Sequence, residues 1–242
     1  QFSTKKYKQV LGGNGWERNS MNLLPNYFGI IQPLGSGKAG FSYAVPDSRL
    51  ENQAQTFVNI PGRDPATNLP LTITKYVINM NDLDTTYNFG PSYALKINDW
   101  LMIGSTIYLH YRNRQLISNQ FLTVNDGRYE WNNVYGSLAE WGVRPILGAM
   151  LIPTDKVSVG LTLSKNLIFS TDKRLQTTFR GLDYGTAAPT YNKWRSTENR
   201  DLPLTATAGI AYFPSQSLLL SADIRYHENV SYTLKSTNDD TG

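Results

Sequence analysis

Residues Pro203 to Thr233 alternate apolar and polar side chains around a turn at Pro214-Ser215-Gln216. After the turn, one alternating set is apolar and consists of Leu218, Leu220, Ala222, Ile224, Tyr226, Val230 and Tyr232. The intervening residues are polar apart from Leu219. Successive side chains point to opposite faces of a β-strand, whereas a helix groups residues three and four apart. The stretch therefore predicts a β-hairpin with one apolar and one polar face.

The same alternation recurs earlier in the chain and predicts four hairpins in all. They lie at about residues 27–45, 86–114, 143–170 and 203–233. The first three turn at Gly35-Ser36-Gly37, at Asn98-Asp99 and at Pro153 to Lys156, which are residue types common in tight turns. Pro91 lacks an N–H and predicts a bulge or local break in its strand.

The segments between the hairpins are polar, and we interpret them as long loops. These loops are expected at about residues 46–68, 118–140 and 172–202. Residues 1–25 are polar and broken by glycines, which predicts a loop or surface segment. The weakly apolar residues 69–80 leave three alternatives open, namely a strand extension, a short helix or a folded loop.

The composition excludes several classes of protein. Charged residues make up 17% of the chain, there are 15 Tyr and two His, and Cys is absent, which excludes a disulfide scaffold and thiolate metal sites. The net charge of +4 is dispersed, without the clustered basic patch that nucleic-acid binding needs. No apolar run reaches the roughly 18 residues of a membrane helix. We expect no enzyme activity, no metal, no cofactor and no nucleic-acid partner.

The predicted tight turns all lie at one end of the sheet and the predicted long loops at the other. Short periplasmic turns, long external loops and alternating strands of about ten residues are typical of outer-membrane β-barrels. Trp100 and Phe213 beside the turns, with Tyr87 and Tyr111 towards the loops, fit interfacial aromatic belts. The sequence thus predicts an all-β fold, a transmembrane antiparallel β-barrel in a bacterial outer membrane. A soluble β-barrel or sandwich is the alternative.

The predicted strands form an incomplete set. The first begins near Tyr27 and the last ends near Thr233, both on the loop side, whereas the termini of bacterial barrels normally lie on the turn side. An open sheet edge cannot face hydrocarbon. We therefore expect residues 1–242 to supply about eight strands of a larger barrel domain. A longer chain, or other chains, would complete the wall.

Three stretches resemble the FadL-type outer-membrane transporters of long-chain fatty acids and other hydrophobic compounds. They are Thr86 to Arg112, Val143 to Asn166 and Asp201 to Tyr226, supported by the stretch NYFGIIQPLGSGKAGFSYAVP near the beginning. The resemblance implies a barrel of about 14 strands, of which this chain carries strands two to nine. It also implies an N-terminal hatch, but the hatch with its Asn-Pro-Ala signature and the last five strands have no match here.

The resemblance further implies that a basic residue inside the barrel binds the substrate carboxylate. Arg112 and Arg114 lie near the matching region, and a guanidinium can bind a carboxylate with two hydrogen bonds. The alternative is that they pair with Asp223 or Glu228 across the lumen. The candidate ligand-binding residues are Arg112, Arg114, His110, Tyr108, Met102 and Arg225. Ser221, Asp223 and His227 share a strand face, as in any polar lumen wall, and predict no catalytic triad.

These expectations define the function that the sequence favours. It is passive uptake of hydrophobic small molecules, such as long-chain fatty acids, through a plugged barrel. The alternative is a structural or anchoring barrel of an envelope complex, with partner proteins at the loops or in the lumen. A water-filled porin fits less well because the interior row includes Met, Leu and several Tyr. The expected partners are membrane lipids, a hydrophobic ligand and other envelope proteins.

Overall fold

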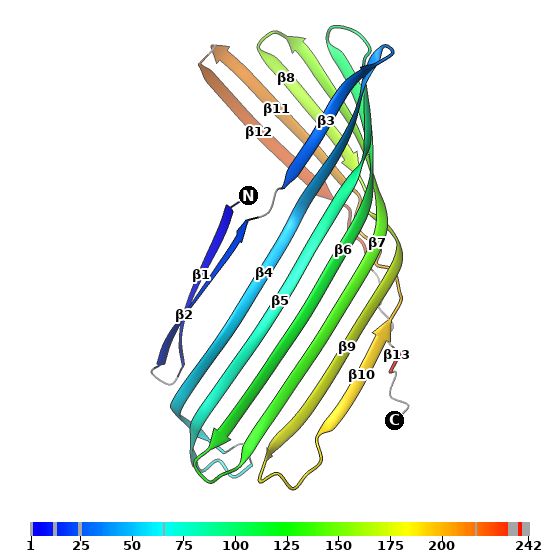
Figure 1. Cartoon of the computed structure of the whole chain (residues 1–242). Helices are drawn as coiled ribbons and strands as arrows, with labels where there is room; N and C mark the ends of the chain where they lie inside the picture. The colour runs from blue at the N-terminus through cyan, green and yellow to red at the C-terminus, as the bar shows by residue number, and fades with distance from the viewer. Residues whose placement is uncertain are drawn as a thin grey trace.

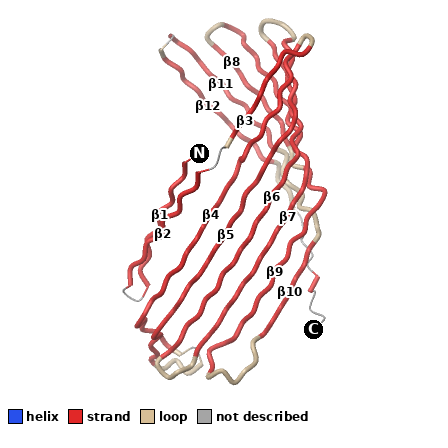
Figure 2. Tube along the Cα trace, viewed as in Figure 1, coloured by secondary structure: helices blue, strands red, loops and turns tan. Residues whose placement is uncertain are grey.

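The chain forms an antiparallel sheet of 11 strands with the order β12-β11-β8-β7-β6-β5-β4-β3 (Figures 1 and 2). β9 also pairs with β7, β10 pairs with β9, and β13 pairs with β10. The computed structural model describes residues 26–64, 66–215 and 217–231 with their side chains, and the backbone alone of 2–11, 14–23 and 237–238. Throughout these residues every regular element is a strand. None of the described residues forms a helix with the length and apolar character needed to cross a membrane.

The strands of the sheet vary widely in length. They are β3 (Tyr27–Leu34), β4 (Gly37–Arg63), β5 (Pro70–Lys96), β6 (Leu101–Val124), β7 (Tyr129–Thr154), β8 (Val157–Ser164), β9 (Leu167–Asp183), β10 (Thr190–Ser196), β11 (Thr205–Ser215), β12 (Leu218–His227) and β13 (Thr237–Asn238). Within the described residues β3 pairs only with β4, and β12 only with β11, so the sheet is not closed.

The four predicted hairpins are present, as the antiparallel pairs β3–β4, β5–β6, β7–β8 and β11–β12. Their tight turns lie together at the upper end of the sheet in Figure 1. In the first of them Leu34 pairs with Gly37 around Gly35, which has a φ of 61°. That left-handed conformation costs glycine little because it has no Cβ. The alternating pattern thus identified the strands and the first three turns. Of the fourth predicted turn, Pro214 and Ser215 belong to β11 and Gln216 is outside the described residues.

The predicted long loops are wrong, because the strands continue through most of these segments. β4 and β5 each have 27 residues, and β4 stays paired with β5 as far as Arg63 and Pro70. Strands β6, β7, β9 and β10 likewise occupy most of 118–140 and 172–202. A strand needs only backbone hydrogen bonds to its neighbours, so it continues where the apolar face ends. Residues 70–80 belong to β5, which decides between the three alternatives for that segment.

The N-terminal residues also differ from the prediction of a loop. Their backbone forms a separate antiparallel hairpin of β1 (Phe2–Leu11) and β2 (Asn14–Leu23), which lies beside β4 (Figure 1). At the other end, β12 stops at His227, earlier than the predicted end at Thr233, which is outside the described residues. Of the predicted polar end, Asn238 belongs to β13 and residues 239–242 are outside the described residues.

Local breaks in the ladder fall at specific residues. Between Phe89↔Leu109 and Ser92↔Thr106 the β5–β6 pairing is interrupted at Gly90-Pro91 without a change of register. This confirms the break predicted at Pro91, which has no N–H to donate. The predicted return strand to Phe169 is interrupted at Lys165-Asn166, which separates β8 from β9. A third break, at residues 197–204, separates β10 from β11.

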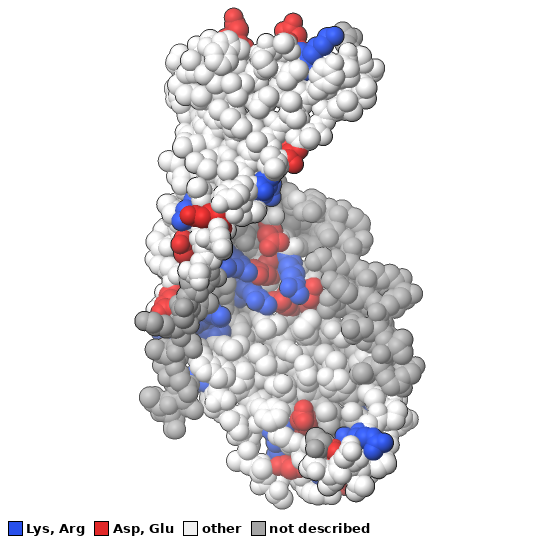
Figure 3. Space-filling model, turned by 180° about the vertical axis from the view of Figure 1, so that it is seen from behind, with Lys and Arg blue, Asp and Glu red and all other residues white. Residues whose placement is uncertain are grey.

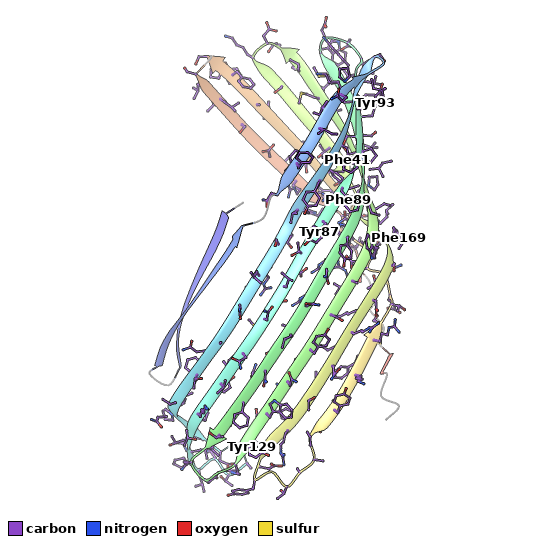
Figure 4. The ribbon with its side chains drawn as sticks, in the orientation of Figure 1. Phe41, Tyr87, Phe89, Tyr93, Tyr129 and Phe169 are labelled. Carbon is purple, nitrogen blue, oxygen red and sulfur yellow. The ribbon has the colours of Figure 1, made fainter. Side chains whose placement is uncertain are left out.

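The two faces of the sheet differ in chemistry. We call the face that carries Tyr87, Tyr111 and Trp141 the outer face, and the opposite one the inner face. From the tight turns to this aromatic level the outer face is apolar and exposed, with Phe28, Ile30, Phe41, Tyr93, Ile103, Ile107, Leu147, Leu161, Leu163, Ile210, Leu220, Ile224 and Tyr226 (Figure 4). Exposed apolar area on this scale, here spread from β3 to β12, marks a surface made for another apolar phase or partner.

The apolar band is bounded by a row of aromatic rings on neighbouring strands. Tyr43 and Tyr87 have ring centroids 6.3 Å apart, Tyr87 and Tyr111 6.1 Å, and Tyr111 and Trp141 4.3 Å. Beyond this row the outer face of β6 and β7 is largely polar, with residues such as Asn113, Gln115 and Ser137. The row is therefore where the outer face changes from apolar to polar.

Candidate functional site

A charged belt crosses the inner face at the level of the aromatic row. It consists of Asp82 and Asp84 on β5, Arg112 and Arg114 on β6, Glu140 on β7, and Arg200 from the segment between β10 and β11. The register makes neighbours of Asp84 and Arg114, and of Arg112 and Glu140. Figure 3 shows acidic and basic side chains gathered on this side about midway along the molecule.

The two arginines of β6 are held by the two aspartates of β5. Arg112 donates from Nε to Oδ1 of Asp84 at 2.9 Å and from Nη2 to Oδ2 at 2.6 Å. Arg114 donates to both carboxylate oxygens of Asp82 at 3.0 and 3.1 Å. Paired hydrogen bonds of this kind fix the plane of each guanidinium as well as its position. The acidic and basic residues therefore alternate in sign from strand to strand.

Glu140 is the most deeply placed charge of the belt, with 0% of its surface exposed. Arg200 donates to its carboxylate from Nε at 2.8 Å and from Nη2 at 2.6 Å. Nε2 of His110 lies 3.7 Å from Oε1 of Glu140, and Nδ1 of His110 lies 2.9 Å from Oδ1 of Asn88. A buried carboxylate is tolerated only when it is paired in this way. Arg200 thus compensates the charge of Glu140 on β7, although β9 lies between the two residues.

A cavity of about 580 Å³ adjoins the belt on the side away from the tight turns. Basic and apolar side chains line it together, including Arg112, Arg114, Lys173, Leu116, Leu138, Leu175, Trp194 and Arg200. This combination of an apolar wall and basic groups suits an amphiphilic ligand with a negatively charged end.

The structure brings together only some of the predicted site residues. Arg112 and Arg114 belong to the belt, and His110 on the same strand lies beside its Glu140. Tyr108 lies two residues nearer the tight turns, with its hydroxyl 2.8 Å from Oγ of Ser42. Met102 pairs with Lys96 and Met150 close to the turn end. Arg225 lies on β12 opposite Thr207. Met102 and Arg225 are therefore outside the belt.

The acidic partners of the arginines are not the ones suggested as an alternative. Arg112 and Arg114 pair with Asp84 and Asp82, whereas Glu228 lies 4.0 Å from Lys165. Sequence reasoning missed Asp82, Asp84, Glu140 and Arg200. The repeats Asp82-Leu83-Asp84 and Arg112-Asn113-Arg114 place two like charges on one face of each strand, and this signal was available.

No family model, curated protein or solved structure matches this chain. The FadL-type resemblance therefore stays a prediction that depends on the quoted sequence stretches. In the residues with described side chains, no group of three or more His, Asp or Glu is arranged to hold a metal ion.

A second polar cluster links the β4–β5 and β6–β7 connections at the end of the sheet opposite the tight turns. Asp64 accepts hydrogen bonds from the backbone N–H groups of Ala66 at 2.8 Å and Thr67 at 3.0 Å, and it pairs with Arg128. Arg128 also donates to Asp126 at 2.8 Å. The hydrogen bond from Arg128, followed by those from the backbone, lowers the pKa of Asp64 to about 2. The cluster joins the β4–β5 and β6–β7 connections.

Proposed function

We propose that this chain forms part of the wall of an outer-membrane β-barrel that conducts hydrophobic small molecules. The observation that supports it best is the exposed apolar band of the outer face, which ends at an aromatic row. In a membrane barrel such a band faces lipid, and aromatic residues lie at its interfaces. The same strands carry a polar and charged inner face, as the wall of a lumen requires.

The height of the band matches a bilayer. From Leu101 to Tyr111 on β6 and from Trp141 to Leu151 on β7, each strand advances ten residues between the row and the turn end. At about 3.3 Å per residue this is roughly 33 Å of strand. A strand tilt of about 45° reduces it to roughly 23 Å along the normal, close to the apolar band of about 25 Å in outer-membrane barrels. The remaining sheet would extend outside the membrane.

The inner face supports passage of a hydrophobic molecule more than a water-filled pore. The cavity beside the belt has Leu116, Leu138, Leu175 and Trp194 among its lining residues. A guanidinium has five N–H donors, and the pairs with Asp84 and Asp82 use two of each. Arg112 and Arg114 are thus able to bind a ligand carboxylate from the cavity while they stay in the belt.

Uptake measurements test this function. The chain, within its native protein, is expressed in Gram-negative cells that lack their own fatty-acid porin, and entry of a labelled long-chain fatty acid is measured. We expect faster entry than in cells with an empty vector, and no faster entry of a labelled disaccharide. Arg112→Ala and Arg114→Ala should slow the fatty acid more than the matching fatty alcohol.

The outcome also separates the transport function from the anchoring alternative. Equal entry of the fatty acid with and without the protein would contradict transport. If a protein partner co-purified in constant ratio in that case, the tall polar part of the sheet would be its binding surface. Equal acceleration of fatty acid and disaccharide would instead indicate a water-filled porin.

A further inference from the structure

The sheet contains a seam where β9 runs beside the segment that joins β10 to β11 almost without backbone pairing between them. Regular pairing of β9 with β10 ends at Lys173↔Ser196, and pairing of β8 with β11 resumes at Ser164↔Thr205. The seam consists of the intervening residues: 165–172, which connect β8 to β9 and begin β9, and 197–204, which connect β10 to β11. One isolated bridge, Leu167↔Asp201, joins the two sides.

The two sides of the seam have equal length, so the pairs on either side of it are in the same register. Eight residues correspond to roughly 26 Å of strand. Pro203 explains part of the interruption, because it has no N–H and restricts Leu202 before it. The segment 197–204 can therefore separate from β9 without a shift of register in the flanking ladders, which would cost many hydrogen bonds.

Side chains hold the seam together in place of the backbone. Arg200 reaches across β9 to the fully buried Glu140 on β7, with hydrogen bonds of 2.8 and 2.6 Å. Nζ of Lys165 lies 3.3 Å from Oδ1 of Asp201 across the seam. At the edge of the seam Arg195 of β10 also donates to Asp172 at 3.1 Å. The Arg200–Glu140 pair is the shortest and most buried of the three, so its loss leaves a buried charge uncompensated and should weaken closure most.

The cavity beside the charged belt reaches this seam. Thr171 from one side of the seam and Glu198 and Arg200 from the other are among its lining residues. Thr171 is buried, and its hydroxyl has no hydrogen-bond partner. An unsatisfied buried hydroxyl destabilises the closed arrangement and would regain a partner in water if the seam opened.

We propose that the wall opens at this seam, that the Arg200–Glu140 pair is its latch, and that opening gives access to the cavity. Segment 197–204 would detach from β9 as a unit while β10 and β11 stay paired. The ladders of β4 to β7 hold the remainder of the sheet rigid. This inference does not depend on which molecule passes through the barrel, or on whether any does.

Hydrogen exchange measured by mass spectrometry on the protein in detergent tests the latch. In Arg200→Gln we expect amides of 197–204 and 165–172 to exchange about tenfold faster or more, the effect of losing a charged hydrogen bond. Arg114→Gln is the matched control, because it removes a similar bidentate pair from a regularly paired part of the β5–β6 ladder. It should leave exchange at the seam unchanged.

A disulfide provides a second test within a single variant. The chain has no cysteine, so Leu167→Cys with Asp201→Cys introduces one pair at the bridge position. We expect its exchange at the seam to be at least about tenfold slower when oxidised than when reduced. Equal exchange in both redox states would overturn the proposal, as would acceleration in Arg200→Gln no greater than in Arg114→Gln.

Discussion

Individual residues show how this sheet holds charge on its inner face. Glu140 is fully buried, and its cost is offset by Arg200, a residue 60 positions later in the chain. Asp82 and Asp84 are matched to Arg114 and Arg112 in the same way. Removal of one partner leaves a buried charge uncompensated, which is costlier than loss of an exposed pair. The belt is therefore a set of matched pairs in which each residue depends on another.

The ion pair of Asp64 with Arg128 should make the 64–69 connection sensitive to pH. For Asp64 the folded pKa of about 2 is below the unfolded value of 3.8. Its contribution to stability is therefore complete above pH 3.8 and is lost as the pH falls through 2, because Asp64 then becomes protonated in the folded state as well. Pepsin, which is active in this range, should cut the 64–69 connection more slowly in the wild type than in Asp64→Asn at pH 4.

The difference between wild type and Asp64→Asn should be much smaller at pH 2, where about half of the folded Asp64 is protonated, and should disappear below that pH. The variant keeps a side-chain oxygen for the backbone hydrogen bonds and lacks the charge, which isolates the effect of ionisation. Equal cleavage of the two proteins at pH 4 would contradict the pairing of Asp64 with Arg128.

At the scale of the element, the hairpins were predictable and their far halves were not. The alternation in 86–114 and 203–233 identifies strands because one face is apolar. In the far halves polar residues interrupt the apolar alternation of the outer face, so β4 and β5 beyond the aromatic row show only a weak apolar pattern, with Leu50, Val58 and Leu83 among the exposed residues. Their pairing, from Asp47↔Thr86 to Arg63↔Pro70, is a property of the backbone.

The candidate site was predictable for similar reasons only in part. Arg112 and Arg114 are two residues apart on a recognised strand, so their shared face follows from the sequence. Glu140 and Arg200 lay in segments interpreted as loops, and their contact is set by the order of strands in space. No local pattern encodes a pair that spans β9.

Gly90 lies where strands β5 and β6 approach each other closely. A Cβ at this position would lie 2.0 Å from the backbone oxygen of Ile107, so the β5–β6 pair approaches too closely for a side chain. Gly90→Ala should therefore destabilise the sheet by about 1–3 kcal/mol. Gly160 on β8 is the matched control, because a Cβ there meets nothing within 4 Å.

Urea unfolding of both glycine variants in detergent, followed by Trp fluorescence, measures this difference. Gly160→Ala should unfold within about 0.5 kcal/mol of the wild type, as substitutions without a steric conflict usually do. Unfolding of Gly90→Ala at the same urea concentration as Gly160→Ala would contradict the close approach of β5 and β6 at Gly90.

At the scale of the whole molecule, one open sheet combines two environments along its length. The half near the tight turns is apolar outside, and the half beyond the aromatic row is polar outside, while the strands β4 to β7 run through both. The charged belt and the seam lie where the two halves meet. If the apolar half is in a membrane, the belt and the seam are at its interface, where a ligand would pass from one phase to the other.

The central claim is that the outer apolar band faces lipid, and depth-dependent fluorescence quenching tests it most directly. Ile107 and Ile117 are both exposed on the outer face of β6, one inside the band and one beyond the aromatic row. Ile107→Trp and Ile117→Trp are compared in a background with the natural Trp residues replaced by Phe, in membranes whose lipids carry bromine at known depths. If the apolar band faces lipid, bromine near the bilayer centre should quench the Trp fluorescence of Ile107→Trp strongly and that of Ile117→Trp hardly at all. Equal quenching of the two variants at every depth would contradict it.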